Sequence, residues 1–81
     1  MNKDDRKTLK NFGTRVRKLR EGLGYSQEKF AEKVQLHRTY IGMVERGEKN
    51  IALINITKIA KGLNVSVNEL FRTELKDEKE N

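Results

Sequence analysis

The sequence predicts an all-α fold, a bundle of five short helices, and three observations lead to it. The chain contains no proline, and its apolar residues recur at intervals of three and four residues rather than in alternation. Glycine and polar residues interrupt this pattern, so that the helices are joined by connections of only a few residues. With 81 residues, the chain has room for a single domain.

We expect the first helix to begin near residue 9, after a basic and polar extension of residues 1–8. The apolar residues that share its buried face are Leu9, Phe12, Val16 and Leu19. Gly22 and Gly24 are expected to end this helix. The domain then spans residues 9–72, and the charged residues 73–81 form a tail that we expect to be disordered.

Capping residues mark the helices that follow. Ser26 is expected to cap a second helix, and a third should run from about Arg38 to Arg46 and end at Gly47. The fourth helix is predicted from the spacing of Leu53, Ile56, Ile59, Ala60 and Leu63. A capping box, in which the Ser66 and Glu69 side chains satisfy each other's backbone amides, is expected to begin a short fifth helix.

The charge of the chain suggests an anionic partner. Lysine and arginine total 18 against 12 aspartates and glutamates, which gives a net charge of +6. The excess lies mainly in the N-terminal third of the chain. A basic N-terminal segment is suited to binding a nucleic acid, although a surface whose charge serves only solubility would show the same composition.

The composition argues against several classes of function. The chain has no cysteine and a single histidine, His37, so neither a disulfide nor a metal site is expected. The same shortage of nucleophiles and acid–base groups argues against an enzyme, and we expect no catalytic residue and no cofactor. No apolar run is long enough for a membrane helix and the N-terminus lacks the features of a signal peptide, so a cytoplasmic protein is expected.

Residues 27–46 carry the spacing of a helix-turn-helix motif. Such a motif needs two helices joined at a steep angle by a short turn, with a small residue where they cross. The residues that meet these demands in order are Gln27, Ala31, Val34, Leu36, Ile41 and Val44. Ala31 is the small residue at the crossing, and Leu36 fills the turn. A DNA-binding domain is therefore the expected function.

Residues 26–34 and 41–47 resemble the XRE-type helix-turn-helix family, which includes Cro and the phage repressors. That family ends its recognition helix with the pattern seen at Ile41, Glu45 and Gly47. The resemblance covers about residues 10–71. It implies a fold like that of the lambda repressor and a transcription regulator that binds a double-stranded DNA operator.

Within that family, residues 36–41 and 45–51 are similar to controller proteins of restriction–modification systems. This narrower resemblance implies a dimeric regulator that activates and represses its own promoter and controls the endonuclease gene. A phage-type repressor and the antitoxin of a toxin–antitoxin pair are alternatives of the same class. An alternative of another class is an interaction module that uses the helix-turn-helix fold to bind protein.

Two residues depart from the family pattern. Gln35 occupies a turn position that is often glycine or asparagine, because the backbone there tends to be left-handed. A glutamine in that conformation should cost about 1 kcal/mol. Ala52 stands where a serine or threonine usually caps the fourth helix. Neither departure removes an expected DNA contact.

The N-terminal end of the second motif helix is expected to enter the major groove. Arg38 is the leading candidate to read a base, because a guanidinium can pair with two acceptors of guanine. Thr39 and Met43 can each contact a thymine methyl group. The alternative for all three is a side chain that meets only phosphate or solvent.

A second set of residues is expected to hold the DNA backbone. Its members are Arg17, Gln27, His37, Tyr40, Arg46, Lys49 and Asn50. Gln27 resembles the family glutamine that binds a phosphate, Tyr40 should pack its ring inward, and His37 can instead cap its helix. Arg17 and Arg20 join the set only if their face of the first helix looks toward DNA, and otherwise both are solvated charges.

Two further surfaces are expected to bind proteins. Apolar residues near the C-terminus exceed what one short helix can bury, so we expect a homodimer interface formed by Val65, Val67, Leu70 and Phe71. The family resemblance implies a contact of Glu28 and Glu32 with the RNA polymerase sigma subunit. Ion pairs with Lys29 and Lys33 on an ordinary surface are the alternative.

Overall fold

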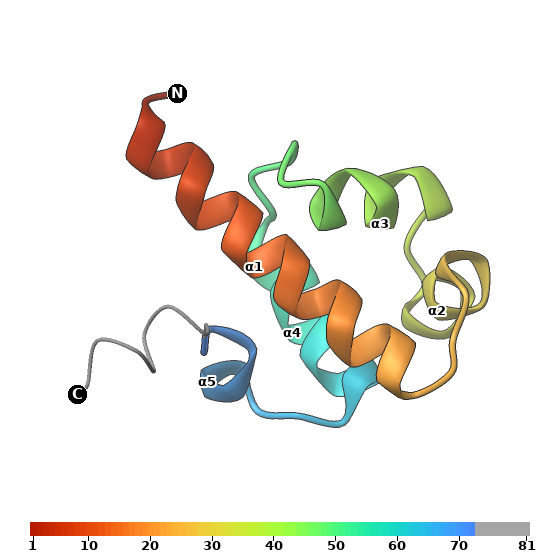
Figure 1. Ribbon diagram of the computed structural model, residues 1–81. Coiled ribbons are helices and arrows are strands. Elements are labelled where there is room, and N and C mark those ends of the chain that lie inside the picture. The colour runs from red at the N-terminus through yellow and green to blue at the C-terminus, as the bar shows by residue number, and fades with distance from the viewer. Residues whose placement is uncertain (73–81) are drawn as a thin grey trace.

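The computed structural model describes residues 1–72, and Figure 1 shows helices joined by short loops. The bounds of the helices are α1 Lys3–Gly22, α2 Gln27–Val34, α3 Arg38–Glu45, α4 Leu53–Leu63 and α5 Val67–Leu70. No β-strand occurs within residues 1–72. The all-α bundle expected from the sequence is therefore confirmed.

The longest helix, α1, runs across the molecule and organises the packing of the others. Figure 1 shows α2 and α3 on one side of α1 and α5 on the other, with α4 passing behind α1. The side chains that are fully buried come from every helix and are Val16, Phe30, Ile41, Val44, Ile59 and Leu70. Burying one such side chain contributes about 1.5–3 kcal/mol, so the fold depends on all five helices.

α1 begins at Lys3, well before the residue 9 expected from the sequence. The side-chain oxygen of Asn2 caps the helix by accepting a hydrogen bond from the N–H of Asp5 at 2.8 Å. Residues 3–8 are therefore the first turns of α1 rather than a separate extension, which corrects the expected boundary. The apolar pattern does not extend to these turns because all their side chains are exposed.

The expected caps of α2 and α5 are present. The Oγ of Ser26 accepts from the N–H of Lys29, and the Oγ of Ser66 accepts from the N–H of Glu69, both at 3.1 Å. α4 begins after Ala52, where no side chain is available to cap it.

The turn between α2 and α3 contains the left-handed residue expected from the sequence. Gln35 has φ 61° and ψ 45°. Its N–H donates to the carbonyl of Glu32 at 3.2 Å, and the N–H of Leu36 donates to the carbonyl of Ala31 at 3.0 Å. These bonds close α2 and redirect the chain into α3.

Two glycines allow α1 to lie directly against the end of α3 and the loop that follows. A Cβ atom on Gly13 would collide with the backbone carbonyl oxygens of Val44 and Glu45. At Gly47, where φ is 75°, a Cβ atom would lie 2.8 Å from the Cα of Lys10. A glycine at each position is therefore needed for the observed packing.

Within the described part of the chain, no helix combines the length and the apolar character required to cross a membrane. The charged tail expected at residues 73–81 lies outside the described residues.

Candidate nucleic-acid interface

α2, the turn and α3 form the expected helix-turn-helix, with α3 as its second helix. Ile41 and Val44 of α3 are buried, whereas Arg38 and Thr39 are exposed at its N-terminal end and Met43 is half-buried. An exposed guanidinium and a hydroxyl group at this end of a helix are suited to reading base edges in the major groove.

Two other candidates lie beside this end of α3. His37 is exposed and occupies the N-cap position of α3, but its side chain makes no capping hydrogen bond. The ring of Tyr40 packs partly against the core, as expected. The Tyr40 hydroxyl oxygen accepts a hydrogen bond from Nδ2 of Asn55 at 3.0 Å, which leaves the hydroxyl hydrogen available for a phosphate.

A buried ion pair connects α1 to the C-terminal end of α3. The Nε and Nη2 of Arg20 donate to the two carboxylate oxygens of Glu45 at 2.7 and 3.0 Å. The side chains are only 8% and 2% exposed. The Nη1 of Arg20 also donates to the carbonyl of Tyr25 at 2.6 Å. The hydrogen bonds with Glu45 raise the pKa of Arg20, so the guanidinium stays charged.

This pair corrects the expected role of Arg20, which is neither a DNA contact nor a solvated charge. The sequence does contain a signal for it. Arg20 lies four residues after Val16, and Glu45 lies four residues after Ile41, so each charge falls on the buried face of its helix. A buried charge needs a partner of opposite sign, and these two residues provide one for each other.

Gln27 joins the buried pair from the start of α2. Its Nε2 donates to Oε1 of Glu45 at 2.9 Å, so the three side chains connect α1, α2 and α3. A carboxamide nitrogen carries two hydrogens, and one of them remains for the phosphate contact expected from the sequence. The buried pair therefore fixes the position of Gln27 at the edge of the motif.

The loop after α3 carries a second ion pair, which is exposed. The Nε and Nη2 of Arg46 donate to the carboxylate of Glu48 at 3.0 and 3.1 Å. These bonds raise the pKa of Arg46 and lower that of Glu48. The Nζ of Lys49 lies 5.9 Å from the centroid of the Tyr40 ring, and Asn50 is exposed. The expected backbone-contacting residues of this loop are thus accessible.

Arg17 is exposed on α1, unlike Arg20. Its Nε lies 3.2 Å from Oε2 of Glu21, one turn further along the helix. A solvent-exposed pair of this kind contributes little to stability, so Arg17 can exchange this partner for another anion at small cost.

Glu28 and Glu32 are exposed on α2. Within residues 1–72, neither carboxylate forms an ion pair. The Nζ of Lys33 instead donates to the hydroxyl of Tyr25 at 2.9 Å. The alternative that these acids are paired with Lys29 and Lys33 is therefore wrong.

The C-terminal apolar residues divide into two groups. Leu70 is fully buried in the core of its own chain, so its expected place in a dimer interface is wrong. Val65 is partly buried against the core, whereas Val67 and Phe71 are exposed. The ring centroid of Phe71 lies 5.1 Å from that of Phe12. Docking of α5 on α1 thus buries Leu70 and leaves its neighbours on the surface.

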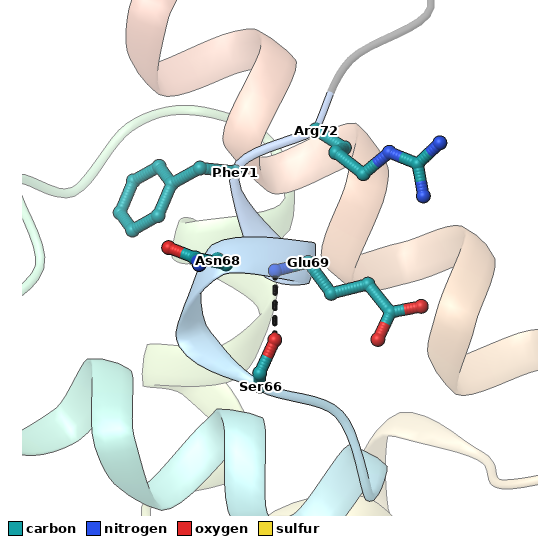
Figure 2. Close-up of a pocket in the computed structure, with 5 residues that line it drawn as sticks. All are labelled: Ser66, Asn68, Glu69, Phe71 and Arg72. Carbon is teal, nitrogen blue, oxygen red and sulfur yellow. Dashed lines mark hydrogen bonds between the residues drawn. The ribbon is translucent and has the colours of Figure 1, made fainter.

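A shallow pocket beside α5 is lined by Ser66, Asn68, Glu69, Phe71 and Arg72. Figure 2 shows the side chains of these residues spread around the short helix, with Phe71 and Arg72 pointing to opposite sides. The carboxylate of Glu69 extends away from Ser66, so the helix keeps the Ser66 half of the expected capping box.

Two large apolar side chains at the start of α4 are also exposed. Leu53 is 72% and Ile54 is 65% exposed. The sequence pattern placed Leu53 on the apolar face of the fourth helix, but the structure leaves this residue exposed. These residues enlarge the exposed apolar surface beyond the set expected from the sequence.

Residues 1–72 contain no group of three or more histidine, cysteine or acidic side chains that could hold a metal ion.

Known proteins resemble this chain in both sequence and fold. The helix-turn-helix family model HTH_3 matches residues 16–70. Control protein C.MunI of Mycoplasma sp is 44% identical over 61 residues, which are 74% of this chain and 82% of that protein. Control protein C.SmaI of Serratia marcescens is 50% identical over 64 residues, 78% of this chain and 76% of that protein. The crystal structure of the restriction–modification controller protein C.AhdI from Aeromonas hydrophila matches with a TM-score of 0.76 and 48% identity, covering 78% of this chain and 96% of that one.

Proposed function

The chain belongs to the helix-turn-helix family that includes the restriction–modification control proteins, and from this we propose that it is a dimeric regulator of its own promoter and of an endonuclease gene. It would act in the cytoplasm on a double-stranded DNA operator. The observation that supports this most directly is the exposed pair Arg38 and Thr39 at the end of α3, held in place by the buried Arg20–Glu45 pair.

Arg38, Thr39 and Met43 are the proposed base contacts. The guanidinium of Arg38 can bond to N7 and O6 of one guanine, which is worth about 1–3 kcal/mol of discrimination against another base. Thr39 offers both a hydroxyl and a methyl group, and the half-buried Met43 offers an apolar surface one turn along the helix.

The side chains proposed to contact the DNA backbone differ in whether they must give up another interaction before they can bind a phosphate. Gln27 and Tyr40 are held by neighbouring side chains, which reduces the entropy that they lose on binding. Arg46 and Arg17 first have to leave their exposed ion pairs with acidic neighbours. The other members of the proposed set are the exposed residues His37, Lys49 and Asn50.

A homodimer is proposed to form through the exposed apolar residues rather than through Leu70. The candidates are Val65, Val67 and Phe71 near the C-terminus and Leu53 and Ile54 on α4. Thr57, one turn after Ile54 on α4, lines the same hollow as Val65 and Val67, which brings this part of α4 close to the start of α5. A symmetric pair would place two copies of α3 about one DNA turn apart, roughly 34 Å.

Glu28 and Glu32 are proposed to contact the RNA polymerase sigma subunit. The support is their exposure on α2 without an ion pair in the described residues, because two like charges one turn apart repel each other mildly. Reversing both charges should abolish activation and leave operator binding unchanged. A parallel loss of operator binding would contradict the proposed contact.

The test of the proposed function is a footprint of the protein on the DNA upstream of its own gene. Two symmetric protected sites are expected there, and Arg38→Ala should remove the protection while the variant remains folded by circular dichroism. No protection by the native protein, at concentrations where it is dimeric, would overturn autoregulation. A monomer in the ultracentrifuge at micromolar concentration would overturn the dimer.

A further inference from the structure

The N-terminal half of α1 carries a row of positive charges. Lys3, Arg6, Lys7 and Lys10 are separated by three, one and three residues, a spacing that places them on one face of a helix. All four are exposed. None of them forms an ion pair with another residue in the 1–72 range. We name this set the basic stripe.

The acidic residues of the same segment lie to the side of the basic stripe or opposite it. Asp5 is two residues from both Lys3 and Lys7, which places it on the other side of the helix. Asp4 lies at the edge of the stripe and lines a shallow hollow together with its four cations. Because the segment has four basic and two acidic residues, the surface of the stripe remains positive.

The stripe lies close to the part of α1 that packs against α3. Gly13, three residues after Lys10, lies directly against the backbone of Val44 and Glu45 at the end of α3. The contact with α5 is made from another face, where the Nε of Arg15 donates to the carbonyl of Glu69 at 3.3 Å. The basic stripe therefore lies nearer to the face of α1 that packs against α3 than to the face that packs against α5.

The stripe also adjoins the loop that is proposed to hold the DNA backbone. Gly47 of this loop packs against the backbone of Lys10. The pKa of Glu48 is lowered chiefly by its hydrogen bonds with Arg46, and also by the charge of Lys10. Figure 1 shows the first turns of α1 extending beyond the loop that joins α3 to α4.

We propose that the basic stripe is a second contact surface for the DNA backbone, next to the α3–α4 loop, which adds phosphate contacts that do not depend on sequence. The inference rests on the proposed function, since it names a further part of the same DNA interface. Cations held close to phosphates release counterions from DNA, and this makes the affinity fall as salt is raised. The stripe would thus strengthen binding without changing which sequence is preferred.

The first test compares two double variants with equal loss of charge. Arg6→Gln with Lys7→Gln removes half of the stripe, and Lys29→Gln with Lys61→Gln removes two exposed cations from α2 and α4. Each is titrated at several salt concentrations with the upstream DNA and with a random-sequence duplex of equal length. The stripe variant should weaken both complexes by the same factor and reduce the salt slope by about one unit for each phosphate that the protein no longer neutralises.

The control variant should keep nearly the native slope, and Arg38→Ala should weaken only the complex with the upstream DNA. Equal salt slopes for the stripe variant and the control variant would overturn the inference. If the native protein still binds the upstream DNA, the proposed function is not affected by that result. Failure of the native protein to bind either duplex would overturn the proposed function itself. A stripe variant that keeps the native slope but loses activation would assign this surface to a protein partner and overturn DNA contact.

A second test measures proximity. The chain has no cysteine, so a single introduced cysteine can carry a DNA-cleaving iron chelate. Lys7→Cys should cut the bound DNA, as Lys49→Cys in the loop should, whereas Asp5→Cys on the opposite face should cut far less. Cuts from Lys49→Cys without cuts from Lys7→Cys would show that the stripe does not reach the DNA.

Discussion

Two arginine–glutamate pairs meet where α3 ends, and they differ in how far they are exposed to solvent. Arg20 and Glu45 are joined by two hydrogen bonds of 2.7 and 3.0 Å with side chains 8% and 2% exposed. Arg46 and Glu48 are joined by two bonds of 3.0 and 3.1 Å with side chains 58% and 52% exposed. The chemical groups and bond lengths are nearly the same, so burial is the main difference.

Burial decides whether such a pair holds the fold together or stays available to bind another anion. A buried charge whose partner is removed cannot be solvated by water. The Arg20–Glu45 pair must therefore stay intact for α3 to keep its position. An exposed pair is replaced by water or by another anion at little cost. The Arg46–Glu48 pair can therefore open when a phosphate arrives, and the buried pair cannot.

The largest effect is expected from Glu45→Ala, which removes both carboxylate hydrogen bonds from the buried guanidinium of Arg20. Arg20 then keeps only the carbonyl of Tyr25 and the carboxylate of Glu21, whose Oε2 lies 3.8 Å from Nη2. The free energy of unfolding, measured by urea titration, should fall by about 3–5 kcal/mol. The matched variant Glu48→Ala, which breaks the exposed pair, should leave the free energy of unfolding nearly unchanged. Similar losses in the two variants would remove the distinction between the pairs.

A smaller effect is expected when both buried charges are replaced together, in Arg20→Met with Glu45→Leu. Neither charge is then left unpaired, so most of the stability should return, and the double-mutant cycle should give a coupling energy of up to about 3 kcal/mol. DNA affinity should still be reduced, because Gln27 no longer has the acceptor that positions it. Native affinity in this variant would show that the pair has no part in placing Gln27.

Glu48→Gln should strengthen DNA binding several-fold. It releases Arg46 from its partner and removes a negative charge beside the proposed phosphate site. The gain should appear with specific and random-sequence duplexes alike, as measured by fluorescence anisotropy. Unchanged affinity, in a variant of native stability, would place Arg46 away from the DNA backbone.

The smallest effect is the titration of Glu48 itself. Its hydrogen bonds with Arg46 lower the pKa in the folded protein below the ordinary 4.5. A carboxylate whose pKa is lowered by folding stabilises the folded protein at pH values above its unfolded-state pKa. This contribution is lost as the pH falls through the lowered, folded-state pKa. Carbon-detected NMR should show the shift, and Arg46→Gln or 1 M salt should return the pKa toward its ordinary value. An unshifted pKa in the native protein at low salt would mean that the pair does not form in solution.

Much of the fold could be predicted from the sequence because its signals are local. Ser26 and Ser66 begin helices through bonds to residues three positions away, and the turn at Gln35 closes on the preceding helical turn. Interactions over such short separations leave a visible pattern in the chain. The exposed end of α3 follows from the same periodicity, which places Arg38 and Thr39 outside the buried stripe.

What could not be predicted depends on how distant segments meet. The Arg20–Glu45 pair joins residues 25 positions apart. The periodicity places each charge on the buried face of its own helix, but it does not say which residue of another helix will be the partner. Leu70 looks available to a partner in sequence, but docking of α5 against α1 buries it. The first turns of α1 were missed for the opposite reason, since they contact no core and carry no apolar pattern.

The left-handed backbone at the end of α2 has a consequence for the amount of this protein in a cell. α4 ends in the same conformation at Asn64, with φ 64°, and asparagine adopts it more readily than the glutamine at position 35 does. Gln35→Asn should therefore raise the folded population by removing strain of about 1 kcal/mol. Changes of that size alter steady-state abundance several-fold, because unfolded chains are degraded. Residue 35 is not among the proposed DNA contacts, yet it would thus affect how much folded regulator the cell contains.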